Sequence, residues 1–389
     1  MVDATLSPAH EALRAEVRAL CARFPNEYWR ELDRAREHPG AFVDALTDAG
    51  YLAALIPERY GGGGLGVTEA SIILEEVNRS GGHSAACHTQ MYVMTALVRH
   101  ASEAQRQRWL PPLARGELRL QAFSITEPEA GSDTTAIRTR AVRAGDGWVV
   151  AGHKNWTSRV ETSDLLLLLA RTTPREDLED RTKGLSLFLV DLRQARAQGA
   201  LTVEPVRTMF NYETYKVTYD GLRLPADVLI GEEGKGFRYA IDGWNAERIL
   251  LAAEAIGDGR WFVERAVAYA NEREVFGRPI GANQGVQFPI AKAYARVVAA
   301  DAVRWQAAAR YDAGEKCGAE ANMAKLLASE ASWEAANACL DTFGGNGFVA
   351  DYDVERKFRE TRLYQVAPVA NNLILAYLGQ HVLGMPRSY

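Results

Sequence analysis

Residues 163–172 read SDLLLLLART, and this stretch is the best starting point for predicting the fold. Its six apolar residues, Leu165 to Ala170, are far fewer than the roughly 20 that a membrane-spanning helix needs. A short apolar run between polar residues is typical of a buried strand. The stretch therefore predicts a β-sheet in the middle of the chain.

Further short apolar runs lie on both sides of this stretch: GWVVAG (147–152), GLSLFLVDL (184–192) and LTVEPV (201–206). Clusters of Gly, Asp and Pro separate them, as they separate the strands of a sheet. The charged segment TTPREDLEDRTKG (172–184) is expected to be an exposed loop. A β domain is therefore predicted for residues 121–232.

The first third of the chain has a helical pattern instead. Ser7 followed by Pro8 predicts a helix start, because serine caps helices well and proline suits the first helical position. Apolar residues then recur at helical spacing from Leu13 to Phe24. Ser102 with Gln105 predicts a second capped helix, which the Pro111-Pro112 pair is expected to interrupt.

Long amphipathic segments return after Gly236 and continue to the end, as in IAKAYARVVAADAVRWQAAARYDAG (290–314). The predicted order is helical, β and helical. We expect an α+β multidomain protein with a helical domain over 1–120, the β domain over 121–232 and a helical domain over 233–389, since 389 residues exceed what one core usually serves.

The bulk properties exclude several classes of protein. The net charge is −5 and basic residues form no stripe, so no nucleic-acid partner is expected. The N-terminus lacks a signal-peptide pattern, and the four cysteines are far apart, without the spacing of metal ligands. We expect reduced, mostly buried thiols, no metal, no membrane insertion and a cytoplasmic location, so any redox chemistry needs an organic cofactor.

The glycine run at 61–66 contains a formal G-x-G-x-x-G pattern. A dinucleotide-binding fold would require a buried strand before it and an acidic residue about 20 positions later. LIPERY (55–60) precedes the run, and its proline and charges suit a central strand badly. We therefore predict a loop and reject a dinucleotide-binding turn.

Four motifs identify a family when they are taken together: TEPEAGSD (126–133), GHKNWTSR (152–159), EREVFGRPI (272–280) and FGGNGF (343–348). TEPEAGSD alone would suggest a β-turn that can present backbone N–H groups and hydroxyls to a polar ligand. In this order the four motifs resemble those of the acyl-CoA dehydrogenase family. The resemblance implies an N-terminal all-α domain, a middle β-barrel-like domain, a C-terminal four-helix bundle and FAD as cofactor.

The resemblance also implies roles for individual residues. Trp156 would stack on the isoalloxazine ring and Ser158 would offer its hydroxyl near flavin N5, although a core position is the alternative for Trp156. The remaining cofactor residues implied near the flavin are Phe123, Ile125, Thr126, Gly131 and Ser132, with Ser132 also near the substrate.

A second set of residues would reach the FAD of a neighbouring subunit, which implies a homo-oligomer, most simply a homotetramer. This set is Arg273, Phe276 and Gln284, and the alternatives are a surface ion pair for Arg273 and a core position for Phe276. Further cofactor contacts are implied at Asp341, Gly345 and Asn372, where Asp341 and Asn372 depart from the usual glutamines. Arg159 likewise stands where the family commonly has an asparagine.

The catalytic base is the main departure. Many members carry it in a Tyr-Glu-Gly-Thr motif, but this chain reads VAPVANN (366–372) and places Pro368 at the glutamate position. Proline accepts no proton and lacks the N–H that would polarise the thioester carbonyl, so Ala367 or Val369 is left as a backbone donor. Isovaleryl-type and long-chain members carry the base in an earlier Glu-Arg pair, which Glu247-Arg248 matches. The alternative for Glu247 is an exposed helix glutamate.

These features predict α,β-dehydrogenation of an acyl-CoA, in which Glu247 takes the α-proton and flavin N5 takes the β-hydride. Burial should raise the pKa of Glu247. Trp244, Asn245 and Arg248 are expected at the substrate, together with Ser132, and electron-transfer flavoprotein is the expected acceptor. The alternatives are an eliminase or desulfinase, a flavin monooxygenase, or a silent flavin- or acyl-CoA-binding protein.

Overall fold

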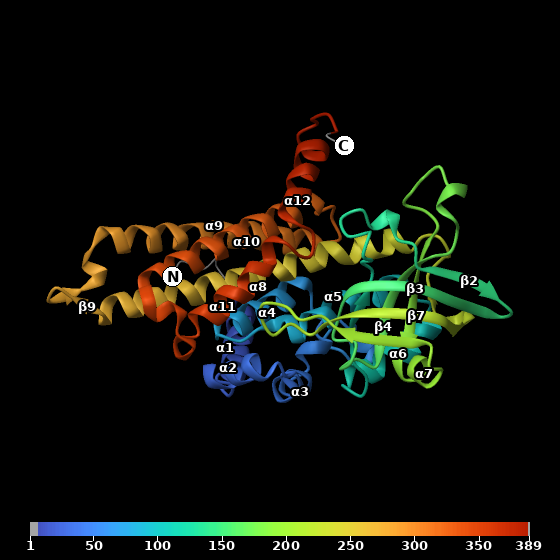
Figure 1. The fold of residues 1–389 in the computed structure, drawn as a ribbon, viewed down its shortest axis with the longest axis horizontal. Helices are drawn as coiled ribbons and strands as arrows, with labels where there is room; N and C mark the ends of the chain where they lie inside the picture. Colours follow the sequence, from blue (N-terminus) through green and yellow to red (C-terminus); the bar gives the residue numbers. More distant parts are fainter. Residues whose placement is uncertain (1–6, 388–389) are drawn as a thin grey trace.

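A computed structural model describes residues 7–387, and in it a sheet separates two helical regions along the chain. Figure 1 shows the long helices along the longest axis, the sheet toward one end and the N-terminal helices against the first long helix. The predicted order of helical, β and helical regions is confirmed.

From residue 7 onward, six α-helices precede the sheet: α1 (Pro8–Cys21), α2 (Asn26–Ala35), α3 (Gly40–Asp48), α4 (Val67–Arg79), α5 (His88–His100) and α6 (Glu103–Ala114). The predicted start of α1 is confirmed, because Ser7 Oγ accepts a hydrogen bond from the His10 N–H at 3.2 Å. The capping box of α6 is also confirmed, with Ser102 and Gln105 bonding to each other's backbone N–H.

The expected break at Pro111-Pro112 is wrong, because α6 continues through both prolines to Ala114. Proline removes a hydrogen bond to the carbonyl four residues earlier. Those carbonyls belong to Gln107 and Arg108, which are exposed to water, while Leu110 and Leu113 are buried. Packing of the apolar face therefore outweighs the two lost hydrogen bonds.

The glycine run lies in a loop before α4, as predicted. A side chain at Gly62 would meet the Ile56 carbonyl oxygen at 2.2 Å, so the backbone packs too closely there for any other residue. The Gly66 N–H bonds to Glu69 at the start of α4. These glycines serve close packing.

The sheet has eight strands: β1 (Leu120–Ser124), β2 (Arg140–Ala144), β3 (Gly147–Ser158), β4 (Leu165–Arg171), β5 (Leu185–Asp191), β6 (Leu201–Pro205), β7 (Thr214–Pro225) and β8 (Leu229–Ile230). Their order is β6-β7-β3-β2-β4-β5-β8, and β1 pairs in parallel with β4. Every residue of β4 is buried, which confirms the prediction for SDLLLLLART. The strands enclose a core of their own that includes Trp148, Phe188 and Tyr219, in keeping with the barrel-like expectation.

The C-terminal part contains α8 (Gly236–Glu272), α9 (Gln284–Asp312), α10 (Gly318–Phe343), α11 (Val354–Thr361) and α12 (Asn371–Tyr377). A small hairpin of β9 (Glu274–Val275) and β10 (Arg278–Pro279) joins α8 to α9. The helices α8, α9 and α10 run side by side, and the shorter α11 packs against α10 and α8. With 37 residues, α8 is roughly 55 Å long, and it also contacts α4, α5 and β5.

No helix within residues 7–387 is long and apolar enough to cross a bilayer. The four cysteines are free thiols and all are buried, as expected.

Buried ion pairs connect the helices. In the cluster that we call the α11 cluster, Glu360 contacts Arg356 at 3.0 Å and Lys357 at 3.3 Å, and Lys357 also contacts Asp258 of α8 at 2.5 Å.

Candidate active site

Glu247 lies on α8 where this helix faces α5, and its side chain is 6% exposed. The alternative of an exposed helix glutamate is therefore wrong. Burial raises the pKa of this carboxyl to about 7, and Glu254 on the same helix adds to the increase. Arg248, a hydrogen-bonding interaction with Tyr92, and Lys325 act in the opposite direction. Glu247 can therefore exchange a proton near neutral pH.

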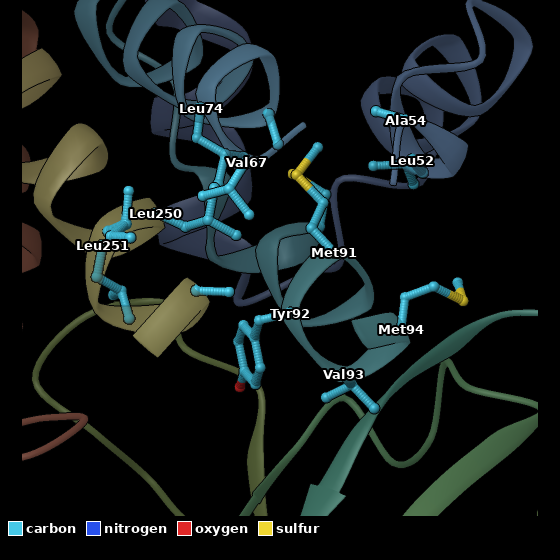
Figure 2. Packing of buried hydrophobic residues seen from close by; sticks show 14 of the residues in the cluster. Leu52, Ala54, Val67, Leu74, Met91, Tyr92, Val93, Met94, Leu250 and Leu251 are labelled. Atoms are coloured by element: carbon cyan, nitrogen blue, oxygen red, sulfur yellow. The ribbon is translucent and has the colours of Figure 1, made fainter. Parts of the chain in front are cut away.

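Tyr92 comes from α5, which packs against α8 and β1. Figure 2 shows Tyr92 on α5 near α8, the helix that carries Leu250 and Leu251, with Met91 directed toward the α4 side chains. Tyr92 is buried, and burial raises the pKa of its phenol well above the usual value. The hydroxyl therefore stays protonated and available as a donor at neutral pH.

Lys325 of α10 closes another side of this region, and the sequence did not single it out. Its side chain is buried, and its ammonium donates to the Val369 carbonyl at 2.8 Å and to Asn371 Oδ1 at 2.9 Å. Burial and the nearby Arg248 lower the pKa of Lys325 to about 7, against the opposing effect of Glu247. Lys325 therefore connects the base region to the segment that carries Pro368.

The segment around Pro368 presents one of the two backbone donors that the sequence left open. The Ala367 N–H is engaged by the Leu363 carbonyl at 2.9 Å. The Val369 N–H has no partner within the described part of the chain, and the Val369 carbonyl accepts the hydrogen bond from Lys325.

Three of the expected substrate residues lie on α8 near Glu247, where Arg248 bonds to Asn245 Oδ1 at 3.2 Å and Trp244 packs edge-on against Phe237.

Trp156 and Ser158 lie at the end of β3, close to the turn that follows β1. The Asn155 N–H bonds to the Thr126 carbonyl at 2.8 Å and so joins the two segments. Trp156 has a left-handed backbone (φ +60°) and is 56% exposed, so the core alternative is wrong for it. Buried Lys154 supports the turn by bonding to the Ile125 carbonyl at 2.6 Å and to Glu127 at 3.0 Å.

These residues fit a flavin. An exposed indole beside a polar turn offers a flat apolar surface together with hydrogen-bonding groups, as an isoalloxazine ring requires. The Ser158 side chain and the turn residues Phe123, Ile125 and Thr126 are partly accessible, while Gly131 and Ser132 are exposed.

The second predicted set lies elsewhere. Figure 1 places the β9–β10 hairpin, with Arg273 and Phe276, at the opposite end of the long helices from β3. Phe276 is fully exposed, so its core alternative is wrong, and no ion pair involves Arg273 among residues 7–387. The third member of this set, Gln284, is exposed too, as are the further predicted cofactor residues Asp341, Gly345 and Asn372. One chain therefore does not bring the two sets together.

Arg159, noted in the sequence only as a departure from a motif, is 2% exposed. Its Nη2 donates to Thr89 Oγ1 on α5 at 2.5 Å, and its guanidinium lies over the Tyr212 ring. No sequence signal indicated this burial.

Comparisons with known proteins agree with this architecture. Models of the N-terminal, middle and C-terminal domains of acyl-CoA dehydrogenases match residues 7–117, 122–221 and 234–381. Acyl-CoA dehydrogenase FadE12 of Mycobacterium tuberculosis (strain H37Rv) is 35% identical over 387 residues, covering 98% of each chain. Cyclohex-1-ene-1-carbonyl-CoA dehydrogenase of Syntrophus aciditrophicus is 31% identical over 383 residues, covering 97% of this chain and 91% of its own. The solved complex of glutaryl-coenzyme A dehydrogenase with glutaryl-CoA superposes with a TM-score of 0.92 at 28% identity, covering 100% of this chain and 98% of that one.

Proposed function

The chain belongs to the acyl-CoA dehydrogenase family, whose members are FAD-dependent oxidoreductases, and we propose that it catalyses the α,β-dehydrogenation of an acyl-CoA thioester with Glu247 as the base. The observation that carries this proposal is the burial of Glu247, which raises its pKa to about 7. A carboxylate with this pKa is a far stronger base than an exposed glutamate and is still partly ionised at neutral pH.

We propose that the residues of the β3 end and the adjoining turn hold FAD. When bound, FAD would supply the acceptor for the β-hydride, which carries both electrons that this oxidation releases. In this proposal Trp156 supports the ring, Ser158 and Thr126 bond to its polar edge, and the set around Arg273 and Phe276 contacts the cofactor of a neighbouring subunit in a tetramer. Electron-transfer flavoprotein is the proposed acceptor of the electrons.

Glu247 takes the α-proton in this mechanism, and the thioester carbonyl needs donors because negative charge develops on it. Pro368 has no N–H, so we assign one donor to the Val369 N–H, which has no other partner in the described structure. Lys325 fixes this segment through the Val369 carbonyl, and Arg248 keeps positive charge near the carboxylate.

The test is an anaerobic titration of the FAD-loaded protein with short, branched, aromatic and long acyl-CoAs, followed by bleaching of the flavin band. We expect Glu247→Gln to retain FAD and to lose flavin reduction by about 10²–10⁴-fold. Glu272→Gln, at the exposed end of the same helix, is the matched control and should reduce flavin normally. Normal reduction in Glu247→Gln, or a bound flavin that no thioester bleaches, would contradict the proposal.

A further inference from the structure

Glu254 is a fully buried glutamate on α8 that the proposed mechanism does not use. It lies two turns beyond Glu247, roughly 10 Å further along the axis and on nearly the same side of the helix. One of its carboxylate oxygens contacts His88 Nδ1 of α5 at 2.7 Å, and the other accepts a hydrogen bond from the Tyr364 hydroxyl at 3.2 Å. Glu254 therefore connects the helix of the candidate base to two other parts of the chain.

The Tyr364 hydroxyl is held from two sides. Tyr364 belongs to the short helix η10 (Arg362–Gln365), and its side chain is buried. Its oxygen accepts a hydrogen bond from Asn78 Nδ2 of α4 at 2.8 Å, while its hydrogen is donated to Glu254. Burial raises the pKa of this phenol well above its usual value, so the hydroxyl remains a donor at neutral pH. The helix η10 is thus fixed to both α4 and α8.

The same hydrogen bonds continue to the α11 cluster. Asn78 also donates to Asp258 Oδ1 at 3.0 Å, and Asp258 contacts Lys357 at 2.5 Å. All three side chains are buried. Burying polar and charged groups is costly, and apolar side chains of similar size often hold helices together at least as well. What a buried hydrogen-bond network can add is one defined arrangement of the elements that it joins.

The segment that follows η10 carries the Val369 N–H. Val369 has a left-handed backbone (φ +64°), which is unfavourable for a β-branched residue and persists only where neighbouring contacts hold it. Lys325 holds the Val369 carbonyl at 2.8 Å. At the other end of the segment, the Val366 and Ala367 N–H groups bond back to the Leu363 carbonyl of η10, both at 2.9 Å. The direction of the Val369 N–H therefore depends on Lys325 at one end and on η10 at the other.

We propose that Glu254 and Tyr364 are positioning residues for the dehydrogenation, because their hydrogen bond holds η10 where the Val369 N–H can meet the thioester carbonyl. His88 and Asn78 support this pair from α5 and α4. The inference rests on the proposed function and assigns a role to residues that act through the backbone. The carbonyl needs its donor most in the transition state, where negative charge develops on its oxygen. A displaced donor should therefore slow flavin reduction and leave the affinity for the thioester nearly unchanged.

The first variant is Tyr364→Phe, which removes the hydroxyl and keeps both the ring and the charge of Glu254. The limiting rate of anaerobic flavin reduction, measured with the acyl-CoA that bleaches the wild type best, should fall by about 10–10²-fold, with less than about a 2-fold change in the apparent Kd. Carbonyl polarisation is measured by infrared spectroscopy of the corresponding 2-enoyl-CoA, labelled with ¹³C at the thioester carbonyl and bound to the oxidised enzyme. In Tyr364→Phe the carbonyl stretch should move toward the frequency of the free thioester.

Two substitutions of Glu254 separate its hydrogen bonds from its charge. Glu254→Gln keeps an oxygen that accepts from Tyr364 and offers an amide N–H to the other tautomer of His88, so the carbonyl frequency should stay at the wild-type value. Because the charge of Glu254 raises the pKa of Glu247, the pH midpoint of flavin reduction should fall by up to about half a unit. The other groups that act on Glu247 remain in place: Tyr92, Arg248 and Lys325. Glu254→Leu removes the hydrogen bonds and should shift the carbonyl frequency as Tyr364→Phe does.

Tyr60→Phe is the matched control. Tyr60 is a buried tyrosine of the N-terminal helical region, and its hydroxyl donates to the carboxylate of Glu103 at 2.9 Å. This variant therefore loses the same kind of hydrogen bond at a place that does not contact η10. It should leave both the rate of flavin reduction and the carbonyl frequency unaffected.

A wild-type rate or a wild-type carbonyl frequency in FAD-loaded Tyr364→Phe would overturn the inference and leave the network with a structural role alone. If Tyr364→Phe does not retain FAD, the two substitutions of Glu254 decide, and equal carbonyl frequencies in Glu254→Gln and Glu254→Leu would overturn it. Failure of every thioester to bleach the wild-type flavin would instead contradict dehydrogenation itself.

Discussion

Two glutamates buried to nearly the same degree have opposite acidities in this protein. Glu247 is 6% exposed and has a pKa raised to about 7, whereas Glu360 is 4% exposed and has a pKa lowered to about 2. Burial raises both pKa values, but at Glu360 the cations Arg356 and Lys357 outweigh it. Geometry and partners therefore decide whether a buried carboxyl is a structural anion or a candidate base.

The two cations near Glu247 bond to other groups, so they compensate the negative charge of its carboxylate only in part. Arg248 bonds to Asn245, and Lys325 bonds to the Val369 carbonyl and Asn371. Each lowers the pKa of Glu247, yet within residues 7–387 neither forms an ion pair with this carboxylate. The α11 cluster, in contrast, pairs Glu360 directly.

The largest expected difference between the two regions is in stability. Glu360→Gln should destabilise the protein by about 3–5 kcal/mol, because it leaves Arg356 and Lys357 buried with less negative charge. Glu247→Gln should be neutral or slightly stabilising, since it removes a poorly compensated carboxylate. Denaturant midpoints of the two FAD-loaded variants provide the measurement, and an equal loss in both would contradict the distinction.

The same comparison predicts opposite dependences of stability on pH. Because the folded pKa of Glu247 lies above its ordinary value of 4.5, its ionisation should remove on the order of 3 kcal/mol of stability as pH rises from 4.5 to 7. The folded pKa of Glu360 is lowered, so its contribution is present above 4.5 and is lost as pH falls toward 2. Thermal unfolding of wild type and Glu247→Gln should therefore diverge between pH 4.5 and 7. Parallel curves would show that Glu247 does not titrate there.

Removing the cation nearest the Pro368 segment should shift the pH profile of flavin reduction. Reduction requires ionised Glu247, so the rate should rise with pH around a midpoint near 7. Lys325→Met should move this midpoint upward by about half a unit to one unit, because an opposing positive charge is lost. Lys292→Met, at an exposed lysine paired with Glu334, should leave the midpoint in place. A downward shift in Lys325→Met would refute this role.

The smallest expected effect belongs to Tyr92. Tyr92→Phe removes the hydrogen-bonding interaction that favours ionised Glu247, so the midpoint should rise by up to about half a unit. Tyr311→Phe is the control, because it removes another buried phenol that interacts with Arg99 far along the chain from Glu247. An unchanged midpoint in Tyr92→Phe, with FAD bound normally, would mean that burial and the neighbouring charges set the acidity of the base without this hydrogen-bonding interaction.

The sequence predicted what local patterns determine. The apolar run at Leu165–Ala170 became the buried strand β4, and the cap residues marked the starts of α1 and α6. The prolines of α6 misled the prediction, because a local rule about backbone hydrogen bonds could not weigh the burial of Leu110 and Leu113.

The residues that surround the candidate base were much harder to predict from the sequence. Tyr92 stands in an apolar helix and is indistinguishable there from an ordinary core residue, and Lys325 has the sequence context of a surface lysine. Their positions depend on how α5, α8 and α10 pack, which brings together residues far apart in the chain. The burial of Arg159 depends in the same way on contacts with Thr89 and Tyr212.

Because α8 is uninterrupted, it fixes the distance between the candidate base and the β9–β10 hairpin. Glu247 and the hairpin that carries Phe276 belong to one helix and its immediate continuation, so their separation and relative rotation are fixed by residue count. Each inserted residue would turn the hairpin by about 100° and move it by about 1.5 Å relative to Glu247. The exposed loop between β4 and β5 is expected to tolerate changes in length, whereas insertions and deletions in α8 between Glu247 and the hairpin should be as disruptive as substitutions in the core.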